Sequence, residues 1–194
     1  MSLVLASGSI IRRQLLDAAG VAFTVDPSAL DESAIKRDHD GDDASLARSL
    51  AEAKAADVSA RLSGKWVIGG DSVVSVDGRR FDKPADRAEA AAHLRAFSGR
   101  TMVLTSAAAL VRDGAVAWSV ADSARLAVRH FGDEFIHNYL EAEWPDVSYC
   151  VGVFRMEGLG VQLFDRVEGS HFTILGLPLL PLLGALRDQG LLAA

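Results

Sequence analysis

Cysteine is almost missing from the sequence, with Cys150 as the single example among 194 residues. One thiol excludes an internal disulfide and a zinc site built from several cysteines. An excess of basic residues is missing as well, because 20 Lys and Arg stand against 26 Asp and Glu, for a formal net charge of −6. General nucleic-acid binding requires a basic surface, so we expect no nucleic-acid partner.

Long hydrophobic runs are also missing. The apolar stretch 172–183 contains Gly176, Pro178 and Pro181, and it is shorter than the roughly 20 residues that a membrane-spanning helix needs. The apolar stretch 1–6 is too short for a signal core, and residues 7–13 are polar and charged. We therefore expect no membrane partner and a cytoplasmic location, which also suits one free thiol.

The composition indicates an ordered globular chain, since 49% of the residues are apolar and 24% are charged. At roughly 150 residues per domain, we expect a single domain over residues 1–194. Apolar runs predict strands, and helical spacing bounded by capping residues predicts helices. The predicted strands are 3–6, 23–25, 66–68 continued by 73–76, 101–111, 115–128, 151–154, 161–164 and 172–174. The predicted helices are 11–19, 45–62, 86–97, 133–143 and 179–187, with a loop at 38–43.

Two long predicted strands in the middle of the chain are joined by Asp113-Gly114, a hairpin turn signal. Antiparallel pairs among alternating helices and strands indicate a mixed α/β fold rather than a doubly wound parallel sheet.

The first predicted strand leads through a turn of small residues into a helix. Such a junction presents free backbone N–H groups and the positive end of a helix dipole to an anion. Ser7 and Ser9 add hydroxyl groups, and Arg12 and Arg13 add charge that can bind a phosphate. The Gly-Lys-Ser/Thr ending of a P-loop is missing. The alternative is that Ser9 only caps the helix and both arginines are solvated.

Carboxylates and lysines near the ends of predicted elements form a second candidate group, Glu32, Lys54, Asp71 and Lys83. Asp71 follows an apolar strand and two glycines, where small residues let a ligand approach closely. A carboxylate there can hold a divalent cation or accept a proton from water, and Glu32 can complete a metal site. The lysines can neutralise phosphate charge. The alternative is ordinary surface salt bridges, above all for Lys54 inside a predicted helix.

Taken in order, these motifs resemble the Maf family, also called septum-formation-inhibitor-like proteins. The matching segments are 5–16, 31–32, 50–55, 68–84, 97–101, 157–160, 168–169 and 176–179. The resemblance implies a nucleoside triphosphate pyrophosphatase, which converts a nucleoside triphosphate and water to the monophosphate and pyrophosphate. It also implies an elongated, partly antiparallel sheet flanked by helices, with two lobes and a central cleft, as in the Ham1 inosine-triphosphate pyrophosphatases.

The same resemblance implies roles for individual residues. Asp71 would be the proton acceptor and would hold a magnesium or manganese ion together with Glu32. A homodimer is compatible with the family. The implied phosphate-binding residues are Ser7, Ser9, Arg12, Arg13, Lys54 and Lys83.

Tyr149 and Cys150 stand where the family has Asp-Lys, so a lysine expected to meet the triphosphate is absent. Arg155 is a candidate to replace its charge. One alternative function is therefore a nucleotide-binding sensor with weakened catalysis that affects cell division. A serine esterase is another, on Gly70-Asp71-Ser72, although the late Asp-x-x-His that it requires is missing.

Base preference depends, by the same resemblance, on Ile11, Ser72 and Glu157. The lack of an arginine at position 11 and the carboxylate at position 157 resemble the branch that cleaves 7-methyl-GTP, whereas Ser72 fits neither branch. A carboxylate accepts from the two parallel N–H donors of guanine, which uracil and thymine do not offer. We therefore expect a modified purine triphosphate as substrate and nucleotide-pool housecleaning as the role.

Overall fold

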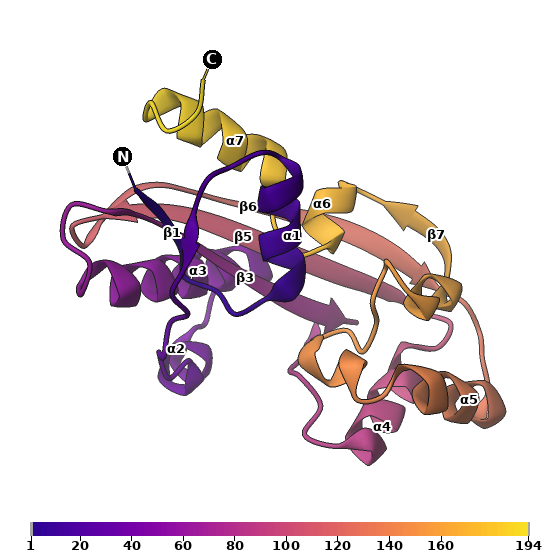
Figure 1. Cartoon of the computed structure of the whole chain (residues 1–194). Coiled ribbons are helices and arrows are strands. Elements are labelled where there is room, and N and C mark those ends of the chain that lie inside the picture. The colour runs from indigo at the N-terminus through magenta and orange to yellow at the C-terminus, as the bar shows by residue number, and fades with distance from the viewer. Residues whose placement is uncertain (1, 194) are drawn as a thin grey trace. The chain divides into compact units, whose positions relative to one another are not determined.

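The strands belong to one seven-stranded sheet in the computed structural model, which describes residues 2–193 (Figure 1). The strand order is β2-β1-β3-β5-β6-β7, and β4 pairs with β3. β1 is parallel to β2 and β3, whereas β3 and β4, and β6 and β7, are antiparallel. The expected mixed sheet flanked by helices is confirmed. The strands are β1 (Leu3–Leu5), β2 (Thr24–Val25), β3 (Trp66–Val76), β4 (Arg79–Phe81), β5 (Thr101–Arg112), β6 (Ala115–Val128) and β7 (Phe164–Glu168).

Three helices begin at a side chain that accepts a hydrogen bond from a free backbone N–H group. Ser9 caps α1 and Asp86 caps α4, as the sequence indicated, whereas Asp42, which lies in the predicted loop, caps α3. Over the described residues, no helix is long and apolar enough to cross a membrane. The helices are α1 (Ile10–Ala18), α2 (Ser33–Asp38), α3 (Asp43–Ser59), α4 (Arg87–Phe97), α5 (Asp133–Glu143), α6 (His171–Ile174) and α7 (Leu179–Asp188), with 3-10 turns at Asp146–Tyr149 and Leu159–Leu163.

The chain divides into two compact units. Unit 1 comprises Met1–Ser72, Thr105–Asp122 and Ser170–Ala194, and unit 2 comprises Val73–Leu104 and Ser123–Gly169. The long strands β3, β5 and β6 contribute residues to both. The single domain over residues 1–194 stays a prediction.

Three predicted strands in the last third of the chain are wrong. Residues 151–154 form turns, where Val153 has a φ of 54° that no strand adopts. Residues 172–174 lie in α6, and 161–164 are mostly a 3-10 turn before β7. A short apolar run cannot by itself distinguish a strand from a buried turn or helix.

The predicted loop at 38–43 is shorter in the structure and spans 39–42, because α2, which was not predicted, ends at Asp38 and α3 begins at Asp43.

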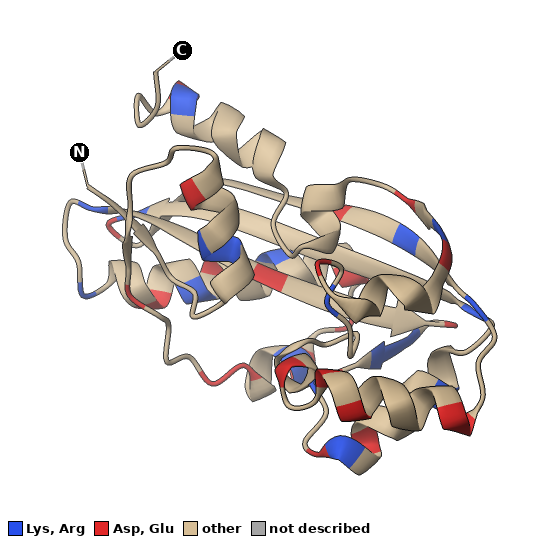
Figure 2. Ribbon diagram, turned by 45° about the vertical axis from the view of Figure 1, so that its right-hand side comes forward, with Lys and Arg blue, Asp and Glu red and all other residues tan. Residues whose placement is uncertain are grey.

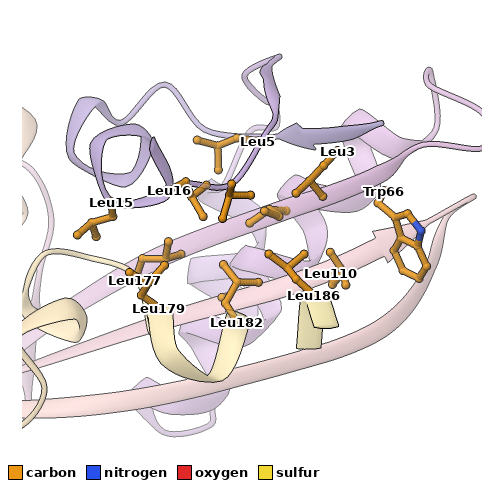
Figure 3. Packing of buried hydrophobic residues seen from close by; sticks show 13 residues of the cluster. Leu3, Leu5, Leu15, Leu16, Trp66, Leu110, Leu177, Leu179, Leu182 and Leu186 are labelled. Atoms are coloured by element: carbon orange, nitrogen blue, oxygen red, sulfur yellow. The ribbon is translucent and has the colours of Figure 1, made fainter. Parts of the chain in front are cut away.

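The core of unit 1 is the leucine cluster, a group of mainly leucine side chains that holds α1 and α7 against the sheet (Figure 3). Burial of each leucine side chain contributes about 2 kcal/mol. The cluster therefore fixes α1, and with it the turn that precedes the helix. Its labelled members are Leu3, Leu5, Leu15, Leu16, Trp66, Leu110, Leu177, Leu179, Leu182 and Leu186.

Two glycines in β3 allow close approach on both faces of the strand. A side chain at Gly69 would overlap the carbonyl oxygen of Ala51 in α3 and lie 2.9 Å from the Cβ of Ala55. A side chain at Gly70 would lie 3.2 Å from the Nε of Arg12. The missing side chains thus bring the backbone of β3 close to α3 on one face and to Arg12 on the other.

Gly69→Ala is expected to lower the free energy of unfolding by about 3 kcal/mol or more, because the backbone of α3 would have to move. Gly184→Ala is the matched control, since a side chain there meets nothing within 4 Å. In a helix this exchange is neutral or stabilises by up to ~1 kcal/mol. Urea unfolding measures both variants, and equal stability of the two would contradict the close packing of β3 on α3.

Candidate functional site

The turn between β1 and α1 holds two serines in different roles. Ser9 accepts from the backbone N–H of Arg12 at 3.4 Å and so caps α1. Ser7 is buried, and its Oγ accepts from the Ser9 N–H and from Nη1 of Arg12, each at 3.2 Å. A hydroxyl that accepts two hydrogen bonds still has its own proton to donate. The turn therefore combines a helix N-terminus with a hydroxyl donor, as an anion site requires.

Arg12 is held on three sides. Its Nε donates to the carbonyl oxygen of Gly176 at 2.7 Å, and its Nη2 donates to Oγ of Ser72 at 3.1 Å, in addition to the bond with Ser7. Burial lowers the pKa of Arg12, and the negative charges of Asp71 and Glu32 oppose this effect. Three of the five N–H groups of the guanidinium are used, so two remain for a ligand.

Lys54 lies between two carboxylates. Its Nζ is 2.6 Å from Oε1 of Glu32 and 2.5 Å from Oδ1 of Asp71. Glu32 immediately precedes α2, Lys54 belongs to α3 and Asp71 to β3, so three elements meet at one ammonium group. Glu32 also pairs with Lys36 at 3.1 Å. The alternative of an ordinary surface salt bridge does not describe Lys54, because its side chain is only 16% exposed.

Glu32 is kept ionised in this arrangement. Burial raises the pKa of Glu32, but hydrogen bonds and charges from Lys54 and Lys36 outweigh burial and hold the pKa below the ordinary value of 4.5. Lys54 and Lys36 together balance the two negative charges of Glu32 and Asp71.

Two adjacent residues of β3, Asp71 and Ser72, contact Lys54 and Arg12 respectively. Successive side chains of a strand point to opposite faces, so Asp71 meets Lys54 of α3 while Ser72 meets Arg12 of α1. β1 ends at Leu5, which pairs with Ile68, and β3 continues beyond this point. Asp71 and the Ser7 turn therefore both lie beyond the end of β1, and the charge of Asp71 reaches Arg12.

A divalent metal fits this donor set only with additional ligands. Among residues 2–193, no group of three or more His, Cys, Asp and Glu side chains is placed to hold a metal ion. The carboxylates of Asp71 and Glu32 nevertheless converge on the Lys54 ammonium. Magnesium is usually held by one or two carboxylates together with water and substrate phosphates. The residues fit an ion that arrives with a phosphate ligand.

The remaining candidate residues are distributed unevenly. In unit 1, Arg13 is exposed and Ile11 half-buried, and neither joins the hydrogen bonds of the Arg12 network within the described part of the chain. In unit 2, Lys83 and Glu157 are exposed, and both act electrostatically on Cys150. Burial, with the charge of Glu157 in addition, raises the pKa of Cys150 to about 11, whereas Arg155 and Lys83 oppose the rise.

Arg155 is already paired. Its Nε donates to Oε2 of Glu143 at 2.9 Å, and its Nη1 lies 2.8 Å from Oδ2 of Asp146. Glu143 is 5% exposed and also accepts from the backbone N–H of Leu159 at 3.3 Å. The guanidinium proposed to replace the missing lysine therefore holds the turns of unit 2 together.

Three polar residues that make side-chain hydrogen bonds were not predicted from the sequence: Glu143, Ser106 and Thr173. All three are buried. Ser106 could have been found, since it carries a hydroxyl in the middle of a mostly apolar predicted strand, and buried polar groups require partners. Lys and Arg are interspersed with Asp and Glu along the ribbon, and this mixture gives no further pointer to a site (Figure 2).

The fold and the site define a mixed α/β protein in which a serine–arginine turn at a helix N-terminus lies beside a lysine-bridged pair of carboxylates. A family model described as Maf-like protein matches residues 2–189. The chain belongs to the Maf-like family, as the resemblance predicted.

Curated relatives match nearly the whole chain. A Nitrobacter winogradskyi protein named nucleoside triphosphate pyrophosphatase is 48% identical over 192 residues, which cover 98% of this chain and 95% of the relative. A Rhizobium etli protein named 7-methyl-GTP pyrophosphatase is 47% identical over 191 residues, 97% of this chain and 96% of the relative. Among solved structures, the Staphylococcus aureus Ham1 protein gives a TM-score of 0.47 at 15% identity, covering 98% of this chain and all of that one.

The thiol of Cys150 is expected to react slowly, because only the thiolate is nucleophilic and a pKa near 11 leaves little thiolate at pH 8. The ordinary pKa of a cysteine thiol is 9.0. The higher pKa of Cys150 lowers the fraction of thiolate about a hundredfold. The rate of reaction with DTNB, measured from pH 7 to 10, should rise about tenfold per pH unit without a plateau.

Urea-unfolded protein is the control, and Cys150 is the single thiol to be labelled. Glu157→Gln should speed the native reaction by removing the negative charge that raises the pKa. A native rate at pH 8 within threefold of the unfolded rate would show that Cys150 is not shielded in this way.

Proposed function

We propose that this chain hydrolyses a nucleoside triphosphate to the monophosphate and pyrophosphate. The proposal is supported by the names of relatives that match nearly the whole chain. The structural observation that supports it most strongly is that the Lys54 ammonium lies between Glu32 and Asp71. Asp71 and the Ser7–Arg12 turn both lie beyond the end of β1. Cleavage of a phosphoanhydride needs this combination of cationic groups for the phosphates and carboxylates for an ion and a water molecule.

Phosphate binding is assigned to the turn and the lysines. The N-terminus of α1 and the hydroxyl protons of Ser7 and Ser9 face an anion at the turn, and Arg12 has two N–H groups left to donate. Lys54 and Lys83 supply further charge. Arg13 is exposed, so we assign it only a long-range contribution to attracting the anion.

Asp71 is assigned as the proton acceptor. Its carboxylate would take a proton from water as the water oxygen bonds to the innermost phosphorus, and the bond to the pyrophosphate leaving group breaks. Asp71 and Glu32 would hold the magnesium or manganese ion, which supplies charge neutralisation and polarises the phosphate. Lys54 holds both carboxylates in place before the substrate arrives.

Base preference is assigned to Glu157, because a carboxylate accepts from two N–H groups of guanine and attracts a cationic 7-methylguanine. The proposed role is housecleaning of modified nucleotides in the cytoplasm.

A nucleotide sensor is the second candidate. One observation favours it: Arg155, which would replace the missing lysine, is neutralised by Glu143 and Asp146. Tight binding of a nucleoside triphosphate without turnover would identify the sensor.

Asp71→Asn should lower kcat at least a hundredfold while leaving the protein folded, because an amide cannot accept the proton from water. Asp77→Asn is the matched control, since Asp77 is exposed in a turn of positive φ that asparagine also tolerates. Pyrophosphate release is measured over a nucleotide panel with and without magnesium or manganese. Undiminished turnover in Asp71→Asn, or turnover that ignores the metal, would contradict the proposal.

Glu157→Gln should lower the kcat/KM for 7-methyl-GTP relative to dTTP by about tenfold or more, the effect of one lost charge-assisted hydrogen bond. Glu134→Gln, another exposed glutamate of unit 2, is the control and should leave the ratio unchanged. A wild-type preference for UTP and dTTP over 7-methyl-GTP would overturn the assignment of Glu157.

A further inference from the structure

A chain of hydrogen bonds leads from Arg12 into the interior of unit 1. Nη2 of Arg12 lies 3.1 Å from Oγ of Ser72, which lies 2.9 Å from Oγ of Ser106. Oγ of Ser106 is in turn 2.8 Å from the carbonyl oxygen of Thr173. Ser106 and Thr173 are fully buried, so their polar groups must find hydrogen-bond partners within the protein.

The direction of each bond in this chain is determined by the number of protons. A carbonyl oxygen only accepts, so the single proton of Ser106 goes to Thr173. Ser72 must then donate its own proton to Ser106. A guanidinium only donates, so the bond between Arg12 and Ser72 runs from Nη2 to the lone pair of Ser72. Ser106 thereby compels Ser72 to present an acceptor to Arg12.

Without Ser106, the Ser72 hydroxyl could rotate and turn its proton elsewhere. The position of Nη2 would then no longer be set by a fixed acceptor, although Ser7 and Gly176 would still hold Nη1 and Nε. Two N–H groups of Arg12 remain for a ligand, and their direction depends on how the planar guanidinium is held. This chain also commits the Ser72 proton, which is therefore not available to read a base.

We propose that Ser106 is a positioning residue, which acts through the hydroxyl of Ser72 to orient the phosphate-binding guanidinium of Arg12. The inference rests on the proposed role of Arg12 in phosphate binding. It assigns Ser72 to the same network in place of the base-reading role implied by the family resemblance. Neither serine touches the phosphate, and both act through Arg12.

The test measures the affinity of the full chain for inorganic tripolyphosphate by isothermal titration calorimetry. Ser106→Ala and Ser72→Ala should each raise the Kd about tenfold, the loss of one charge-assisted hydrogen bond. Because the two hydroxyls act in series, the double variant should bind no more than twofold more weakly than either single variant. In an Arg12→Ala background, Ser106→Ala should change the Kd less than twofold.

Thr173→Val is the matched control for a merely structural effect. It removes an equally buried hydroxyl, which donates to Asp122 at 2.5 Å, yet retains the backbone carbonyl that accepts from Ser106. The Kd of Thr173→Val for tripolyphosphate should stay within twofold of the wild type. If Ser106→Ala fails to fold, the Kd of Ser72→Ala tests the inference in its place. Equal Kd values for Ser106→Ala and Thr173→Val, or a full tenfold effect of Ser106→Ala without Arg12, would overturn the inference. Failure of the proposed function would appear separately, as wild-type protein that hydrolyses no nucleoside triphosphate.

Discussion

The ammonium of Lys54 between Glu32 and Asp71 is the interaction on which the site depends. Both carboxylate oxygens lie within 2.6 Å of the same nitrogen, so without a cation two negative charges would face each other across roughly 5 Å. At an effective dielectric constant of 20 that repulsion is about 3 kcal/mol. The lysine removes it and ties the start of α2, the middle of α3 and the centre of β3 to one point. A substrate that brings its own cation meets two carboxylates that already lie close together.

The two faces of β3 contact the two halves of the site, Lys54 of α3 on one face and Arg12 of α1 on the other. Gly69 lets α3 approach closely enough for Lys54 to reach Asp71, and Gly70 leaves room for Arg12 on the other face. The alternation of the strand then sends the carboxylate of Asp71 to the lysine and the hydroxyl of Ser72 to the arginine. Because the leucine cluster holds α1 on the sheet, the orientation of Arg12 is set by packing as well as by hydrogen bonds.

The sequence predicted the parts of this structure that depend on local signals. Ser9 and Asp86 act as the helix caps that the sequence indicated, and Asp113-Gly114 joins two long strands as expected. Asp42 caps α3 from within the predicted loop. The strand predicted around Val153 is wrong, because these turns are held by the ion pair between the buried Glu143 and the half-buried Arg155 rather than by an apolar pattern. The network through Ser106 depends on contacts across 34 and 67 residues, which no local pattern encodes.

The account is tested most directly by locating the metal. Crystals grown with manganese and a non-hydrolysable nucleoside triphosphate analogue would reveal the ion by its anomalous scattering. The account predicts an ion bound by the carboxylates of Asp71 and Glu32, with the triphosphate at the Ser7–Arg12 turn and Lys54 shifted towards the phosphates. An ordered ion and triphosphate bound elsewhere, with Lys54 still bridging the two carboxylates, would contradict it.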